Sequence, residues 1–233
     1  MCPRFSQAAS WQEVRNLFNL GEADWRFGPR YNIRPTEEVP IIRRIETDGH
    51  ARELAMAVWW LVPPWADTPN SKYPMFNARA ESLLERKAYA EPARHKRCLI
   101  PMTGWFEFNP EGKVRQPYYF TLKSSALFAV AGLWQVSTRG PDPVVSCTLI
   151  TVEGNPLIAR HHPKNRMPAL LPPEAWESWL DCGGVEAEMA IGRLGPWPEE
   201  DLAVHAVDRT ELARKYGDSP ACIAPWTPVP DRG

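Results

Sequence analysis

The amino-acid sequence predicts a mainly β protein with a few short helices, folded as one domain. Its 25 prolines exclude long helices, because proline lacks an amide hydrogen and its ring blocks the helix interior. Short apolar segments separated by turn residues follow one another from residue 39 onward, which is the pattern of strands joined by tight turns. A length of 233 residues is enough for a sizeable core, and no repeat, linker or glycine-rich phosphate loop divides the chain.

The first expected element is a helix that begins after residue 10. Ser10 is a plausible N-cap and Glu13 follows three residues later, which is the spacing of a capping box. The apolar residues between Trp11 and Phe18 recur with helical spacing, and Gly21 would end the helix.

The remaining chain is expected to be strands with two further helices. Strands are expected over residues 39–42, 54–60, 98–100, 117–122, 127–136, 144–152, 169–171 and 202–207, and helices over 83–89 and 176–180. Turn residues separate the strands between 117 and 152, so an antiparallel meander is expected there. From about residue 211 the pattern is weak, and this tail is expected to have little structure.

Charge and cysteine content exclude several classes of protein. A net charge of −1 excludes a globally basic nucleic-acid binder but not a local basic patch. The odd number of cysteines, without any C-x-x-C pair, disfavours a disulfide framework and a zinc site and suits a reducing cytosol. These cysteines are Cys2, Cys98, Cys147, Cys182 and Cys222. No signal peptide or membrane-length apolar run is present, so we expect a cytoplasmic protein without a membrane partner.

Cys2 is the most informative residue of the chain. Removal of Met1 would leave an α-amine and a thiol on adjacent carbons, a 1,2-aminothiol that condenses with an aldehyde and closes to a thiazolidine ring. An α-amine also titrates near neutral pH, so part of it is unprotonated and nucleophilic there. The alternative is an incidental cysteine in a frayed terminus.

Four polar residues each have a structural and a functional interpretation. Asn32 and Arg34 suit turn chemistry and surface charge. Asn77 precedes an expected helix, where it could cap the helix or orient a substrate through its amide. Glu107 is flanked by aromatic residues. Facing inward, it would have a raised pKa suited to proton transfer, and facing outward it would be one polar position of an alternating strand.

Tryptophans and a basic run raise the question of nucleic-acid binding. Trp59, Trp60 and Trp65 lie beside prolines and could fill the core or stack on bases. The basic run over residues 94–97 could be a solvated face or a phosphate track.

The adjacent histidines His161 and His162 suggest a metal site at first. No third ligand stands at a metal-site spacing, however, and a single histidine can act in acid–base chemistry alone. We therefore expect neither a metal nor a cofactor.

Six blocks of sequence, in order, resemble one protein family. They are Cys2 with Arg4–Ser6, the run Tyr31–Thr36, the segment Trp59–Trp65, the run Asn77–Glu81, the run Gly104–Glu107, and His161 ahead of Arg166–Pro168. Over residues 2 to about 210 the chain resembles the SOS-response-associated peptidase (SRAP) family. In that family the N-terminal cysteine forms a covalent crosslink with abasic sites in single-stranded DNA.

The resemblance implies a fold, a partner and roles for individual residues. It implies a barrel-like α+β domain with short flanking helices and a positively charged cleft, acting on single-stranded DNA that contains abasic sites. We expect a monomer that associates with the nucleoid on DNA damage, with autoproteolytic removal of Met1 and weak abasic-site lyase activity. The implied catalytic residues are Cys2, Asn77, Glu107 and His161, and the implied DNA-binding residues are Arg4, Asn32, Arg34, Trp59, Trp60, Arg79 and Arg86.

Two departures from the family and two other functions accompany this interpretation. Pro3 stands where the family usually has glycine, and Lys164 stands where the family often has histidine. His161 is therefore assigned by a longer spacing, with His162 as the alternative. A non-covalent nucleic-acid-binding barrel with an idle Cys2 is one other hypothesis. A thiol peptidase acting on other proteins, with Cys2 or Cys147 as nucleophile, is the second.

Overall fold

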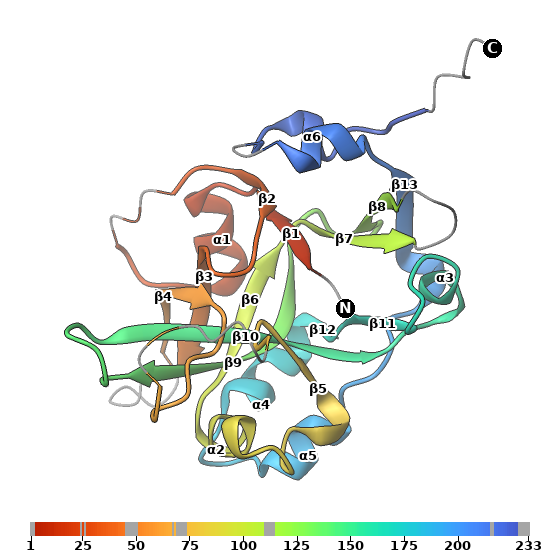
Figure 1. The fold of residues 1–233 in the computed structure, drawn as a ribbon. Helices are drawn as coiled ribbons and strands as arrows, with labels where there is room; N and C mark the ends of the chain where they lie inside the picture. The colour runs from red at the N-terminus through yellow and green to blue at the C-terminus, as the bar shows by residue number, and fades with distance from the viewer. Residues whose placement is uncertain are drawn as a thin grey trace.

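The structure is a computed structural model and describes residues 3–23, 25, 27–44, 51–66, 68, 74–109, 115–214 and 217–227. Cys2 lies outside these ranges. Two β-sheets with several short helices form the molecule (Figure 1). The predicted mainly β, α+β fold is therefore confirmed.

Five strands close into a barrel, which confirms the barrel-like prediction. They are β3 (Glu38–Arg44), β4 (Arg52–Trp59), β6 (Arg97–Met102), β9 (Phe128–Ser137) and β10 (Val144–Glu153). The pairs β4–β3, β3–β6, β6–β9 and β9–β10 are antiparallel, and a parallel pairing of β10 with β4 closes the ring. Short strands extend it: β5 (Asn77–Arg79), β11 (Arg166–Pro168) and β12 (Leu170–Leu171).

A second sheet, which the sequence pattern does not separate from the barrel, contains the N-terminal strand. Its order is β13-β8-β7-β1-β2. The bounds are β1 (Arg4–Gln7), β2 (Arg30–Ile33), β7 (Gly104–Asn109), β8 (Gln116–Leu122) and β13 (Leu202–Ala206). Because β1 lies between β2 and β7, residues 4–7 are held inside a sheet rather than at a free edge.

The first helix, α1 (Trp11–Phe18), forms where the sequence predicts it. The Ser10 hydroxyl accepts from the Glu13 amide while the Glu13 carboxylate accepts from the Ser10 amide, which is the expected capping box. The helix ends at Asn19, not at Gly21 as predicted. Asn19 adopts a left-handed conformation with φ of 50°, which asparagine tolerates better than most residues.

The helix predicted over residues 83–89 starts later. A 3₁₀ turn over Ala80–Ser82 precedes α2 (Lys87–His95), whose last turn contains part of the basic run over residues 94–97. Arg97 is buried instead of exposed, and its guanidinium donates to the carbonyl oxygens of Trp179 at 2.6 Å and Asp181 at 2.7 Å. The basic run is therefore divided between a helix end and a buried structural arginine.

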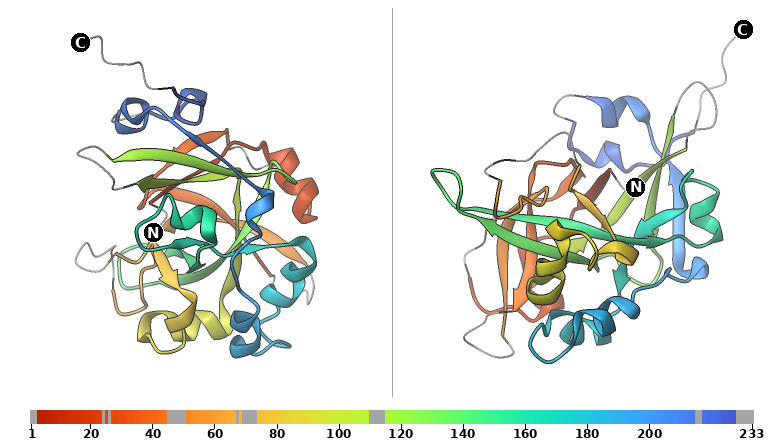
Figure 2. Two further views of the ribbon diagram at one scale, coloured as in Figure 1. Left: turned by 90° about the vertical axis from the view of Figure 1, so that its right-hand side faces the viewer. Right: turned by 60° about the horizontal axis from the view of Figure 1, so that its bottom comes forward.

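The remaining helices are short. They are α3 (Pro156–Ala159), α4 (Trp176–Leu180), α5 (Ala187–Gly192) and α6 (Arg209–Ala213), with 3₁₀ turns at Pro173–Ala175, Glu199–Asp201 and Pro220–Cys222. Helices α2, α4 and α5 gather at one end of the molecule and α6 lies at the other (Figures 1 and 2). No helix in the described ranges is long and apolar enough to cross a bilayer.

The C-terminal segment packs against the second sheet where the structure describes it. Cys222 is buried, and the carbonyl of Ile223 lies 2.8 Å from Nε2 of His205 on β13. The side-chain amide of Asn32 on β2 donates to the carbonyl of Gly217 at 2.7 Å. The sequence pattern predicts little structure beyond about residue 211, but these contacts hold the described part of that segment against the second sheet.

Trp59 is a core residue. Its side chain is fully buried, its indole donates to the carbonyl of Phe76 at 2.7 Å, and its ring meets Phe5 edge-on at 4.7 Å between centroids. The sequence-based assignment of Trp59 to base stacking is therefore not supported, because no surface of the ring reaches solvent. Of its two interpretations, Trp59 fits the one in which it fills the core.

We expect Trp59→Ala to destabilise the fold by about 3–5 kcal/mol, because the substitution leaves a large cavity in a packed core. Trp65→Ala is the matched control, since the Trp65 side chain is 48% exposed and little packing is lost. Urea unfolding monitored by circular dichroism would measure both. Equal midpoints for the two variants would contradict the core assignment.

Candidate active site at the start of the N-terminal strand

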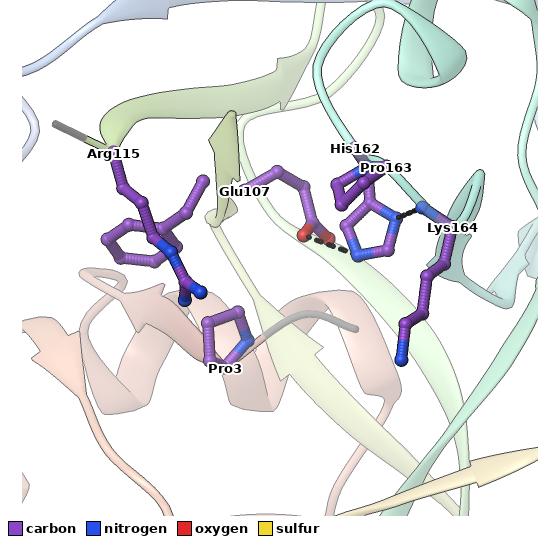
Figure 3. A pocket seen from close by; sticks show the side chains of 7 residues that line it. Pro3, Glu107, Arg115, His162, Pro163 and Lys164 are labelled. Carbon is purple, nitrogen blue, oxygen red and sulfur yellow. Dashed lines mark hydrogen bonds and ion pairs between the residues drawn. The ribbon is translucent and has the colours of Figure 1, made fainter. Parts of the chain in front are cut away.

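A pocket of about 330 Å³ opens where the N-terminal strand begins (Figure 3). It is lined by Pro3, Glu107, Phe108, Arg115, His162, Pro163 and Lys164. These residues come from the segment leading into β1, from strand β7 with the residue just before β8, and from the loop between α3 and β11. The pocket therefore exists only in the folded protein.

The pairing of β1 with β7 brings Pro3 to Glu107. Arg4 is opposite Phe106 and Phe5 is opposite Trp105 in an antiparallel register, so the next step along both strands places Pro3 opposite Glu107. A trans peptide keeps consecutive Cα atoms about 3.8 Å apart. Covalent geometry thus ties Cys2 to a residue that lines the pocket.

A buried hydroxyl network fixes β1 in this position. The Ser6 hydroxyl lies 2.6 Å from the Tyr119 hydroxyl and 2.9 Å from the Thr103 hydroxyl. Gly104 leaves room for this arrangement, because a Cβ there would lie 2.3 Å from the Tyr119 ring. The Gly104–Glu107 block thus contains both a residue that admits the tyrosine and a carboxyl group in the pocket.

Glu107 faces inward, which is the orientation in which the sequence predicts a raised pKa, and its role in proton transfer stays a prediction. Its side chain is 1% exposed, and neither carboxyl oxygen has a hydrogen-bond partner in the described ranges. Burial raises the pKa of Glu107 to about 8. At neutral pH the group is therefore mainly a protonated acid, which can donate a proton.

His162 is the histidine that meets Glu107. Its Nε2 atom lies 3.5 Å from Oε2 of Glu107, and its side chain is 5% exposed. The backbone amides of Lys164 and Arg166 both donate to Nδ1, at 3.2 and 3.3 Å. Nδ1 is therefore unprotonated and the proton of the neutral ring is on Nε2, facing the carboxyl group.

Burial, reinforced by the nearby cations Lys164 and Arg166, lowers the pKa of His162 to about 4. The imidazole is then neutral at physiological pH. Because Glu107 is also mainly neutral, the two side chains form a pair of uncharged proton carriers rather than an ion pair.

His161, the catalytic histidine favoured from the sequence, points elsewhere. Its Nδ1 lies 3.0 Å from the Leu157 carbonyl, and its ring packs edge-on against Tyr118 at 4.4 Å between centroids. The short helix α3 continues into a turn in which the amides of both His161 and His162 donate to the Ile158 carbonyl, and the two rings contact different residues. The structure thus brings the alternative, His162, to Glu107.

Asn77 is 6% exposed and lies on β5, paired in parallel with Leu149 of β10. It does not cap the following 3₁₀ turn, whose N-cap is Arg79 without a side-chain bond. Asn77 is not among the residues that line the pocket, so its expected role at the reaction centre stays a prediction.

Comparisons with known proteins agree with this architecture. The family described as SOS response associated peptidase (SRAP) matches residues 1–211. The chain belongs to the SRAP family. It is 33% identical over 211 residues to the abasic site processing protein YoqW of Bacillus subtilis, covering 89% of this chain and 92% of that one. It is 29% identical to the abasic site processing protein HMCES of Xenopus tropicalis, over 88% of this chain and 68% of that one.

A solved structure supports the same fold. The crystal structure of a protein from Bacteroides thetaiotaomicron superimposes with a TM-score of 0.84 at 25% identity, covering 97% of this chain and all of that one. The family match over residues 1–211, together with the relatives above, confirms the family resemblance drawn from six short blocks.

Two of the SRAP blocks meet in a salt bridge that sequence inspection missed. Arg166 binds Glu81 through two parallel contacts, at 2.7 Å to Oε1 and 3.0 Å to Oε2, and also donates to the Thr151 carbonyl at 2.5 Å. The same residue donates its amide to His162. The opposite charges of the two blocks are a signal that could have suggested this bridge, which ties the histidine loop to the barrel.

Three expected DNA-binding residues of the SRAP chain form a cluster within the protein. The Arg4 guanidinium donates to the Asn32 side-chain oxygen at 3.1 Å and to the Leu212 carbonyl. Arg34 donates to Leu212 at 3.3 Å and to the Arg214 carbonyl at 2.6 Å. These contacts connect the first two strands to the C-terminal segment.

The other expected DNA-binding residues are more accessible. Arg79 and Arg86 are exposed, and Trp60 is half-buried against Phe76 at 5.5 Å between ring centroids. Trp65, which is exposed, lies under the Lys87 ammonium at 5.0 Å from the ring centroid. An aromatic and cationic surface therefore lies around Trp65 and the start of α2.

Cys147, the alternative nucleophile, lies in the barrel wall on β10. Its side chain is fully buried, and burial raises the pKa of the thiol far above its ordinary value. A nucleophile must reach its substrate as a thiolate, so a peptidase that uses Cys147 is not supported. No group of three or more potential metal ligands occurs within the described part of the chain.

Proposed function

We propose that this SRAP protein processes abasic sites by forming a covalent thiazolidine crosslink between Cys2 and the lesion in single-stranded DNA. The observation that carries the proposal is a pocket that holds two neutral proton carriers, Glu107 and His162, and that is also lined by Pro3, the residue after Cys2 in the sequence. Relatives named abasic site processing proteins, which match over most of this chain, support the substrate class.

The reaction begins with the α-amine of Cys2. Removal of Met1, in which Cys2 acts as an autoproteolytic thiol, exposes this amine. An α-amine has a pKa near 8, so a usable fraction is unprotonated at neutral pH. An abasic sugar equilibrates between a closed ring and an open aldehyde. As the ring opens, the amine adds to the aldehyde carbon and forms a carbinolamine.

Glu107 acts first as an acid in this scheme. It protonates the carbinolamine hydroxyl, which leaves as water, and its carboxylate then takes the nitrogen proton, so a neutral imine forms and Glu107 is again the acid. The Cys2 thiol then adds to the imine carbon, its proton passes to the nitrogen, and the thiazolidine ring closes. The net reaction joins one amine, one thiol and one aldehyde with loss of one water molecule. His162 Nε2–H donates to the sugar oxygen while the ring opens.

The same imine permits a second outcome. Loss of a proton from the carbon next to the imine expels the 3′ phosphate by β-elimination, which is an abasic-site lyase reaction. Fast closure by the thiol competes with this cleavage, so we propose that lyase activity is the minor reaction.

DNA contacts are proposed for the accessible residues. Arg79 and Arg86 would contact phosphates, and Trp60 and Trp65 would border stacked bases, since base–aromatic stacking requires an exposed ring. We place Arg4, Asn32 and Arg34 among the residues that hold the site together, because their polar groups contact the C-terminal segment.

Intact-mass spectrometry after mixing the protein with an abasic single strand tests the proposal. We expect one adduct with the mass of protein lacking Met1 plus oligonucleotide minus one water. A strand with a tetrahydrofuran abasic analogue, which has no aldehyde, is the control and should give no adduct. A non-covalent binding module would give no adduct with either strand.

The Glu81–Arg166 bridge gives a prediction about positioning. We expect Glu81→Gln to slow crosslinking by roughly tenfold, because it breaks a bidentate charge-assisted contact and frees the loop that presents His162. Glu81→Asp keeps the charge and should recover part of the rate. The melting temperature should fall by only about 2–4 °C, the shift that roughly 1 kcal/mol produces in a domain of this size. An unchanged rate would assign the bridge to stability alone.

A further inference from the structure

The mouth of the pocket carries two cations that the proposed chemistry does not use. Arg115 and Lys164 line the pocket together with Glu107 and His162. They project from opposite sides of it, Arg115 from the segment entering β8 and Lys164 from the loop ahead of β11 (Figure 3).

Both cations are available to a ligand. Arg115 and Lys164 are exposed, and neither side-chain cation makes a hydrogen bond or ion pair with any described residue. The nearest carboxyl group in the pocket, Glu107, is mainly protonated at neutral pH and so compensates little of their charge. On a chain of net charge −1, this is a local concentration of positive charge in the pocket that holds the two proton carriers.

Arg4 and Arg34, near the amino terminus, differ from Arg115 and Lys164 in what their side chains contact. Arg4 and Arg34 direct their guanidinium groups to carbonyl oxygens of the protein, and burial lowers the pKa of Arg4. Their positive charges are therefore used to hold the C-terminal segment. The cations that face the reaction centre come instead from two loops that the sequence did not single out for DNA binding.

We propose that Arg115 and Lys164 form a phosphate clamp that binds the two phosphates flanking the abasic sugar, one on each side of the pocket. This inference rests on the proposed function. A nucleotide within a strand carries a phosphate on both sides of its sugar, and two cations on opposite walls match that arrangement. The clamp would centre the reactive carbon over Glu107 and His162 and would select a lesion inside a strand over a free sugar aldehyde.

Lys164 also connects the clamp to the acid–base pair. Its backbone amide donates to Nδ1 of His162 at 3.2 Å, so a phosphate held by its side chain acts on the same residue that fixes the histidine tautomer. Binding energy from the phosphate is therefore applied next to the reacting groups, where it can position the substrate.

The test compares two aldehydes on Arg115→Gln, Lys164→Gln and the double variant. An abasic oligonucleotide carries both phosphates, whereas 2-deoxyribose carries none. We expect the ratio of the oligonucleotide rate to the deoxyribose rate to fall about tenfold for each charge removed, because a charge-assisted contact is lost only with the oligonucleotide. Lys164→Arg keeps the charge and should keep the ratio. Arg193→Gln, an exposed cation after α5, is the matched control.

Salt dependence provides a second, independent measurement. For binding of an intact single strand, which has no aldehyde, each Gln variant should reduce the log–log salt slope by about 0.7, and the Arg193 control should leave it unchanged. Unchanged ratios and slopes in both single variants would overturn the clamp. A wild-type protein that reacts with neither aldehyde would overturn the proposed function, and the salt slopes alone would then decide whether these cations bind phosphate.

Discussion

Cys2→Ala should form no heat-stable crosslink with abasic single-stranded DNA, whereas wild-type protein should form one. In Cys2→Ala protein prepared with Met1 already removed, the α-amine of residue 2 is free, so the imine can still form, but no thiol is present to close the thiazolidine ring. An imine hydrolyses readily, and its loss on heating distinguishes it from the ring. Denaturing gel electrophoresis with and without heat would measure the difference, which we expect to be complete.

Cys2→Ser supplies the matched control. Its hydroxyl is a much weaker nucleophile than a thiolate, yet in protein likewise prepared without Met1 its α-amine is free. We expect borohydride to trap an imine adduct with both variants, because reduction converts the imine to a stable amine. Longer incubation should also increase strand cleavage by either variant. The open imine persists, because no thiol closes the ring in competition with β-elimination. A heat-stable adduct of full yield from Cys2→Ala would exclude the thiazolidine.

Much of the fold follows from local sequence patterns. The strands of the barrel are apolar segments between turn residues, and the capping box of α1 is visible as Ser10 and Glu13. The closure of the barrel is not visible, because it depends on the parallel pairing of β4 with β10, where Val58 is opposite Ser146. Pairing over such a distance leaves no local periodicity. The same closure buries Trp59, so its position in the core could not be deduced from its neighbours.

The candidate site likewise contains residues that local sequence reveals and residues whose positions depend on the folded chain. Glu107 stands out in the sequence as a carboxylate among aromatics, and the structure places it inward with a raised pKa. The choice between His161 and His162 depends on how one turn after α3 directs adjacent rings, which no spacing rule resolves. Arg4 and Arg34 are expected from the family resemblance to bind DNA, but both donate to the carbonyl oxygen of Leu212, far along the chain.

Glu107→Gln and His162→Ala should each slow crosslinking by about 10²-fold or more, the usual contribution of a positioned proton carrier. Glutamine has the shape of the protonated acid but cannot release a proton to the leaving hydroxyl. Alanine at 162 removes the Nε2–H that faces the same pocket. His161→Ala should retain nearly the wild-type rate, because its ring packs against Tyr118 rather than facing Glu107.

The pH profile separates the acid role of Glu107 from a purely structural one. The reactive form requires a protonated Glu107 and an unprotonated α-amine. The wild-type rate should therefore rise as the amine loses its proton near pH 8 and fall as Glu107, with a pKa of about 8, ionises. Glu107→Gln has no carboxyl group to ionise, so its residual rate should rise with pH and then level off. Single-turnover crosslinking from pH 6 to about pH 10 would record both curves. An alkaline decline that persists unchanged in Glu107→Gln would assign that decline, and with it the acid role, to another group.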